Sequence, residues 1–144
     1  MPIITSAVWR TAIVVTLLNA ASAVGGAIAI LLTHGLGMPL SMLSGSPFSS
    51  FVAPALILLV VVGGTQTLAS VLQIRRRPIS LLWTAFAGFT MVIWILVETV
   101  LIRGFGPLQV LYFATGALQI ILTLTLLGIV SWIPRIDLRV DSTP

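Results

Sequence analysis

The stretch ISLLWTAFAGFTMVIWILVETVLI, residues 79–102, decides the fold of this chain, because it contains one charged residue, Glu98, in an otherwise uncharged run. As an α-helix it would be about 36 Å long, at about 1.5 Å per residue. That length crosses a hydrocarbon core of about 30 Å with some tilt. Since backbone groups inside lipid must be hydrogen-bonded within their own segment, the run is predicted to be a transmembrane helix.

Three other apolar runs have a similar length and composition. They cover about residues 11–33, 51–74 and 108–132. Each is long enough for one membrane crossing. We therefore predict an all-α fold, a four-helix transmembrane bundle that forms a single integral membrane domain over residues 1–144, with a cytoplasmic tail at 133–144.

The composition supports a membrane protein and excludes several kinds of function. Hydrophobic residues make up 58% and charged residues 7% of the chain, whereas a soluble domain carries about 25% charged residues. The absence of Cys excludes disulfides, thiolate catalysis and Cys-ligated metals. The net charge of +4 comes from scattered arginines that flank the apolar runs, so it does not indicate nucleic-acid binding. Arg without Lys is typical of GC-rich coding, so we expect a location in a bacterial cell membrane.

The arginines predict an orientation, because cytoplasmic loops of membrane proteins carry an excess of basic residues. Six of the seven fall on one side if both termini are cytoplasmic, and only Arg103 then faces out. The six are Arg10, Arg75, Arg76, Arg77, Arg135 and Arg139. Three tryptophans, Trp9, Trp83 and Trp132, would then lie near the inner interface, which indole rings prefer. We therefore predict the N-in, C-in arrangement.

Three segments allow two interpretations each. The Ala-Ser-Ala of residues 21–23 resembles a signal-peptide cleavage site, but the apolar run continues to Leu32, so we expect an uncleaved first span. The loop at 34–50 is uncharged and partly apolar, so we expect it to lie against the membrane surface; a cap between the helices is the alternative. We expect the tail at 133–144 to be disordered, and pairing with a partner's strand is the alternative.

Each predicted span carries small or polar residues at steps of three or four, which places them on one helix face. The candidate polar residues inside the membrane are Asn19, Gln66, Glu98, Arg103, Gln109, Tyr112 and Gln119. Amide side chains hydrogen-bond between helices, each bond contributing roughly 0.6–2 kcal/mol, so we expect them to hold the bundle interior together. The alternative is a polar cavity beside Glu98, lined by Gln66, Gln109, Gln119 and Tyr112.

Glu98 is the only acidic residue before position 137. It lies about one turn, roughly 6 Å, below the predicted outer end of its span. There a charge costs less than the roughly 2.5–3.5 kcal/mol that it costs at the bilayer centre. We expect a structural role, in which Glu98 pairs with Arg103 or accepts a hydrogen bond from Gln109 or Tyr112. The alternative is a functional carboxylate that binds a proton or a cation.

No pattern of catalytic or metal-ligating residues accompanies these groups. His34 is the only histidine and has no second His, Cys or loop carboxylate, whereas a metal site needs three or four ligands. The serines of the 34–50 loop have no base placed by a recognisable motif. We therefore predict no enzyme activity, no cofactor and no metal.

Three short stretches carry a resemblance to a known group of proteins: LSGSPFSSFVAPALILLVVVGG at 43–64, MVIWILVETVLI at 91–102 and LQVLYFATGALQ at 108–119. They resemble a group of small, uncharacterised bacterial four-helix integral membrane proteins. In that group an S-P-F loop leads into span 2, a W-I-x-V-[EQ] element lies in span 3, and L-Q-x-x-Y-F opens span 4. The His-Gly pair at 34–35 adds a looser likeness to DoxX-like proteins. The resemblance implies the membrane fold and supplies no reaction.

These observations lead to two functional hypotheses. We predict a multi-pass membrane protein that acts as a non-enzymatic accessory or scaffold subunit by helix packing. Its partners would be the lipid bilayer and either another membrane protein or further copies of itself, and not nucleic acid. The alternative is a small-solute or proton-coupled transporter that uses Glu98.

Overall fold

The computed structural model describes residues 3–129. Its α-helices are α1 (Ile3–Thr33), α2 (Val52–Ile57), α3 (Gly64–Ile74), α4 (Ser80–Ile102) and α5 (Pro107–Leu126). A π-helical segment, Leu58–Gly63, joins α2 to α3, so the two form one continuous helix over Val52–Ile74. A short 3₁₀ helix, Leu40–Leu43, lies in the loop after α1.

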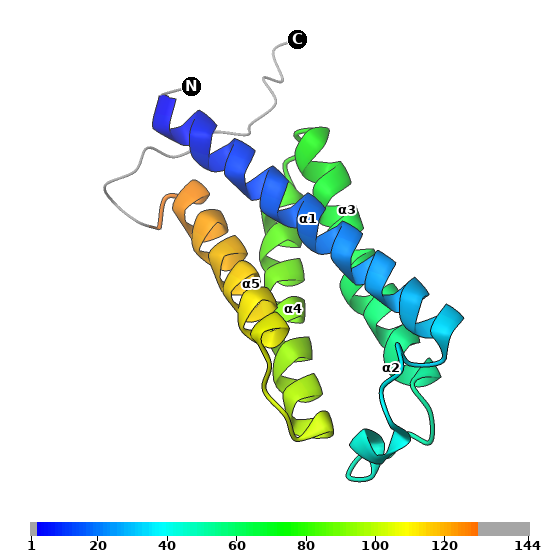
Figure 1. Cartoon of the computed structure of the whole chain (residues 1–144). Helices are drawn as coiled ribbons and strands as arrows, with labels where there is room; N and C mark the ends of the chain where they lie inside the picture. Colours follow the sequence, from blue (N-terminus) through cyan, green and yellow to red (C-terminus); the bar gives the residue numbers. More distant parts are fainter. Residues whose placement is uncertain (1–2, 130–144) are drawn as a thin grey trace.

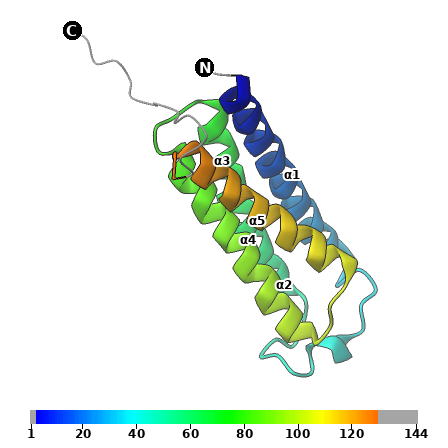
Figure 2. The same cartoon turned by 90° about the vertical axis from the view of Figure 1, so that its left-hand side faces the viewer.

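Within residues 3–129, four helices are long and apolar enough to cross a membrane, which confirms the predicted all-α bundle. They are Thr5–Thr33, Val52–Ile74, Ser80–Ile102 and Pro107–Leu126. Successive helices run in opposite directions (Figures 1 and 2). The start of α1, the α3–α4 turn and the end of α5 lie at one end of the bundle. The loop after α1 and the α4–α5 turn lie at the other end, which we call the loop end.

The surface of the bundle is apolar, and much of its interior is small or polar. On α4, Leu82, Ile93 and Val100 are 58–74% exposed, whereas Thr84 is fully buried. In water such a surface would be unfavourable, but lipid tails are as apolar as these side chains. The four apolar helices are therefore compatible with a multi-pass membrane protein.

Two glycines face each other where helices α4 and α5 pack together. A Cβ atom at Gly88 would lie 2.8 Å from Ile120 Cγ1 and 3.2 Å from the Gly116 carbonyl oxygen. A Cβ atom at Gly116 would lie 3.3 Å from the Gly88 carbonyl oxygen. Small residues permit this kind of backbone contact between membrane helices, so the crossing depends on both glycines.

The helices at the two ends of the chain have bounds that differ from the predicted ones. The first helix begins at Ile3, eight residues before the predicted start, and α5 ends at Leu126 instead of 132. Gly128 ends α5 because it adopts a positive φ of 72°. Its N–H bonds to the Thr125 carbonyl and that of Ile129 to the Leu124 carbonyl, which together form a Schellman motif.

Trp9 packs inside the bundle instead of facing its surroundings. Its side chain is only 4% exposed and contacts Ala12, Leu81 and Leu126. The indole therefore fills the core between α1, α4 and α5, and its level relative to the inner interface stays a prediction. Trp132 and the tail at 133–144 lie outside the described residues.

The loop after α1 covers the loop end of the bundle, so the cap describes it better than the expected position flat on the membrane surface. Leu43 is 4% exposed and Phe51 is 6% exposed. The Phe51 ring lies where a side chain at Gly35 would be, since a Cβ there would come within 2.5 Å of its Cδ2 atom. Gly35 also has a φ of 118°, so both its backbone and its surroundings favour glycine.

Candidate functional site

Three amide side chains from three helices form a hydrogen-bonded network in the bundle interior, which we call the amide network. Asn19 of α1, Gln66 of α3 and Gln119 of α5 are each at most 2% exposed. Gln66 and Gln119 exchange two hydrogen bonds, each from the Nε2 of one to the Oε1 of the other and each 3.1 Å long. Asn19 Nδ2 donates to Gln119 Oε1 at 3.2 Å.

Helix α4 joins the amide network through its backbone. Gln66 Nε2 donates to the Ala87 carbonyl and Gln119 Nε2 to the Thr84 carbonyl, both at 3.1 Å. Each of the two glutamine NH₂ groups thus makes two hydrogen bonds, which is its full capacity. The network connects all four spans and has the arrangement that the packing interpretation of these residues predicts.

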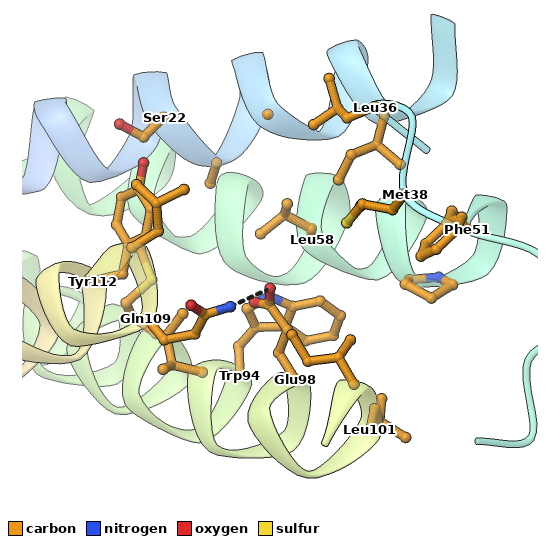
Figure 3. Close-up of a pocket in the computed structure, with 18 of the residues that line it drawn as sticks. Ser22, Leu36, Met38, Phe51, Leu58, Trp94, Glu98, Leu101, Gln109 and Tyr112 are labelled. Carbon is orange, nitrogen blue, oxygen red and sulfur yellow. Dashed lines mark hydrogen bonds between the residues drawn. The ribbon is translucent and has the colours of Figure 1, made fainter. Parts of the chain in front are cut away.

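A cavity of about 310 Å³ lies between the helices toward the loop end, and Figure 3 shows it from the side. We call it the Glu98 cavity. The apolar part of its lining is Ala23, Gly26, Ile30, Leu36, Met38, Leu43, Phe51, Pro54, Leu58, Met91, Ile95, Leu101, Ile102 and Leu108. The residues with polar side-chain atoms are Ser22, Trp94, Glu98, Gln109 and Tyr112. The volume is at the lower end of the roughly 300–1,000 Å³ typical of small-molecule pockets.

Glu98 is the one charged residue in this lining. Gln109 Nε2 donates to its Oε1 at 3.4 Å, a long hydrogen bond. The side-chain oxygen of Gln109, Oε1, accepts a hydrogen bond from the Gly106 N–H at 3.0 Å and so caps the start of α5. Trp94 lies one turn before Glu98, with its indole beside the carboxylate, and the Tyr112 hydroxyl points toward Ser22 (Figure 3).

Arg103 does not pair with Glu98, which corrects the expected ion pair. Arg103 ends α4 in the left-handed conformation, with φ 48°. Its side chain instead reaches Gly45 in the loop after α1, where a Cβ atom would lie 2.9 Å from Arg103 Nε and Nη2. Among the described residues, Gln109 is the one whose side chain hydrogen-bonds Glu98 in the expected way.

The structure thus divides the predicted site residues into two groups. The amide network contains Asn19, Gln66 and Gln119, and the Glu98 cavity contains Glu98, Gln109 and Tyr112; Arg103 belongs to neither. The alternative of one polar cavity lined by Gln66 and Gln119 as well is wrong, because these two use their amide groups on each other.

Most of the cavity lining could not be recognised in the sequence. Apolar residues such as Met38, Leu43, Phe51 and Leu58 look the same whether they line a cavity, pack in the interior or face lipid. The available signal was the partly apolar, uncharged loop after α1, whose Leu36, Met38 and Leu43 now cover the cavity.

Some buried polar groups in the other half of the bundle have no partner. Among residues 3–129, neither amide atom of Gln73 has a hydrogen-bond partner, although the side chain is fully buried, and the hydroxyl of Ser80 has none either. Gln73 lies two turns after Gln66 on α3. It therefore offers a comparison with the fully bonded Gln66.

Comparisons of the chain with protein-family models, with curated proteins and with solved structures gave no match. The resemblance to small bacterial four-helix membrane proteins and to DoxX-like proteins therefore stays a prediction. Within residues 3–129, no three His, Cys, Asp or Glu side chains come together in a way that would hold a metal ion.

Proposed function

We propose that the protein binds a small, mostly apolar solute in the Glu98 cavity, between its membrane helices, as the binding step of a transporter. The observation that carries this proposal is the cavity of about 310 Å³ beside the single carboxylate of residues 3–129. The pocket is partly open at the surface of the bundle, where Leu36 and Leu108 of its lining are 54% and 61% exposed. A concave, mostly apolar pocket of this size with a few polar groups is the usual form of a small-molecule site.

The lining of the cavity favours an apolar occupant over water. At about 30 Å³ per molecule, the space corresponds to about ten waters. Buried waters typically make two to four hydrogen bonds each, but only five of the lining residues have polar side-chain atoms. An apolar body with one polar group fits both the fourteen apolar residues and the few polar ones that surround it.

The π-helical segment Leu58–Gly63 supports a role in transport. Leu58 lines the cavity, and Gly63 packs against α1, where a Cβ atom would lie 3.0 Å from Val24 Cγ2. π-helical turns are rare and frequently occur at functional sites. A change between π and α geometry would shift this wall of the cavity, which is the kind of movement that solute release requires.

We further propose that the protein lies in a bacterial cell membrane with both termini in the cytoplasm and that it has no enzyme activity. The accessory or scaffold role stays a prediction, since the amide network and the Gly88–Gly116 crossing join helices of this chain to one another.

A cavity-filling substitution tests the proposal. Gly26 lines the cavity, and a Cβ atom there would meet only Leu58 Cδ2, at 4.0 Å. Gly26→Leu therefore has room to place its side chain in the solute's space. Gly25→Leu is the matched control, because Gly25 is the neighbouring residue, is not part of the lining and has no atom within 4 Å of its Cβ position.

Binding can be followed by the fluorescence of Trp94, which lies in the lining. Replacing the other three tryptophans with Phe leaves Trp94 as the only one. The probe is 2-(4-bromophenyl)ethanol, whose bromine quenches a nearby indole, added to protein in phosphatidylcholine nanodiscs. We expect saturable quenching in the single-tryptophan protein that keeps both glycines and in its Gly25→Leu variant. We expect the quenching to be lost in the Gly26→Leu variant. Saturable quenching that is unchanged by Gly26→Leu would contradict the proposal.

A further inference from the structure

We infer that the solute is a small apolar amine, bound as a cation with its ammonium group next to Glu98 and the ring of Trp94. This inference names the solute class for the site described above, and so it rests on the proposed function. It is carried by the charges around the cavity, by the aromatic rings in its wall and by the hydrogen-bonding capacity of Glu98.

The charge balance at the loop end favours a cation. Glu98 is the one acidic residue of residues 3–129, and no basic side chain lines the cavity. Arg103 lies against Gly45 instead, and His34 is exposed outside the lining. The other described basic residues, at positions 10 and 75–77, belong to the opposite end of the bundle. A carboxylate in low-polarity surroundings is unfavourable unless it is paired, and a bound ammonium group would pair it.

The aromatic rings in the wall favour the same class of ligand. The indole of Trp94 lies beside the Glu98 carboxylate, and Tyr112 lines the same cavity from α5 (Figure 3). Cations are attracted to the faces of Trp and Tyr rings, and most strongly to Trp. The Glu98 carboxylate together with the adjacent Trp94 ring is thus a suitable environment for an organic ammonium group, and the Tyr112 ring lies farther along the same lining.

Glu98 also has hydrogen-bonding capacity left for such a ligand. Gln109 Nε2 makes a long contact of 3.4 Å with Oε1, and the Trp94 side chain also hydrogen-bonds the carboxylate, so about two of its acceptor positions stay available. A carboxylate has about four acceptor positions, and an ammonium group has three donors. The body of the amine would then lie against apolar lining residues such as Leu58 and Met91. An anion would be repelled by an ionised Glu98, and a neutral solute would not gain the charge-assisted hydrogen bond that an ammonium group makes to a carboxylate.

Two probes of nearly identical shape test the inference. They are 2-(4-bromophenyl)ethylamine, which is cationic at pH 7, and the neutral 2-(4-bromophenyl)ethanol. Both are titrated against protein with Trp94 as its only tryptophan, in nanodiscs of zwitterionic phosphatidylcholine so that the lipid does not concentrate the amine. We expect the amine to bind at least about tenfold more tightly than the alcohol, as a charge-assisted hydrogen bond implies.

The variants then assign the preference to Glu98. Glu98→Gln should weaken amine binding by about tenfold or more and change alcohol binding by less than about twofold. Arg103→Gln is the matched control at the same end of the bundle, and we expect it to leave the amine preference unchanged because Arg103 does not reach the cavity.

The possible failures are distinguishable. Equal or weaker binding of the amine compared with the alcohol, with both abolished by Gly26→Leu, would overturn the inference and leave the proposed function standing. Binding of neither probe would contradict the proposed function itself. If Glu98→Gln loses both probes, Glu98→Asp decides, since it keeps the charge: a retained amine preference supports the inference, and its loss overturns it.

Discussion

The amide network predicts that Gln119→Leu strongly destabilises the bundle. The substitution removes the hydrogen bonds of Gln119 to Asn19, to Gln66 in both directions and to the Thr84 carbonyl. The Thr84 carbonyl remains part of helix α4. The loss of the three side-chain hydrogen bonds, however, leaves polar groups of Asn19 and Gln66 unpaired. Hydrogen bonds between membrane helices contribute about 0.6 kcal/mol on average and up to about 1.7 kcal/mol. The expected loss in the free energy of unfolding is therefore about 2–5 kcal/mol.

The measurement is the free energy of unfolding in bicelles, by steric trapping, with Gln73→Leu as the matched control. Gln73 is as fully buried as Gln119, but neither of its amide atoms has a partner in the described part of the chain, so its replacement should be neutral or stabilising. The double variant Gln66→Leu/Gln119→Leu should lose at least about 1 kcal/mol less unfolding free energy than the sum of the two single variants. Each single variant leaves the other glutamine with unpaired groups, and the double variant removes both glutamines. Equal losses at Gln73 and Gln119, or strict additivity in the double variant, would refute this reasoning.

Three further predictions follow from the packing and the turns. Gly88→Ala should cost about 1–3 kcal/mol of unfolding free energy by overpacking the α4–α5 crossing, whereas Gly25→Ala, with nothing within 4 Å, should not; equal effects would contradict the crossing. Glu98→Gln and Arg103→Gln should have additive effects on stability, within about 0.5 kcal/mol in a double-mutant cycle, and a larger coupling would reveal an ion pair. Ser44→Cys should react with a membrane-impermeant maleimide in intact cells, and reaction only after lysis would reverse the predicted orientation.

The helices could be predicted because the bilayer constrains them so strongly. A long apolar run has few alternatives to a helix in lipid, and the continuous helix Val52–Ile74 begins one residue after its predicted start. The ends of the chain were harder. Gly128 is a recognisable stop signal for α5, whereas the burial of Trp9 depends on how α1 crosses α4 and α5.

The candidate site could be predicted only in part, because its hydrogen bonds depend on which residues of neighbouring helices lie at the same level along the bundle. Gln66 and Gln73 lie on the same face of α3, yet Gln66 is fully hydrogen-bonded and Gln73 has no partner within residues 3–129. The difference lies on the neighbouring helices, where Gln119 stands level with Gln66. Similarly, Arg103 comes only five residues after Glu98 in the sequence, but it does not pair with it. Arg103 ends α4 in the left-handed conformation, and its side chain reaches the loop after α1.

The most direct test of the central claim is a crystal structure of the protein grown with 2-(4-bromophenyl)ethylamine, with data collected at the bromine absorption edge. The account predicts one strong anomalous peak per chain inside the Glu98 cavity, near Leu58 and Met91, with the ammonium group next to Glu98. Bromine peaks only on the lipid-facing surface of the bundle, or a cavity filled by a lipid acyl chain in place of the probe, would contradict it.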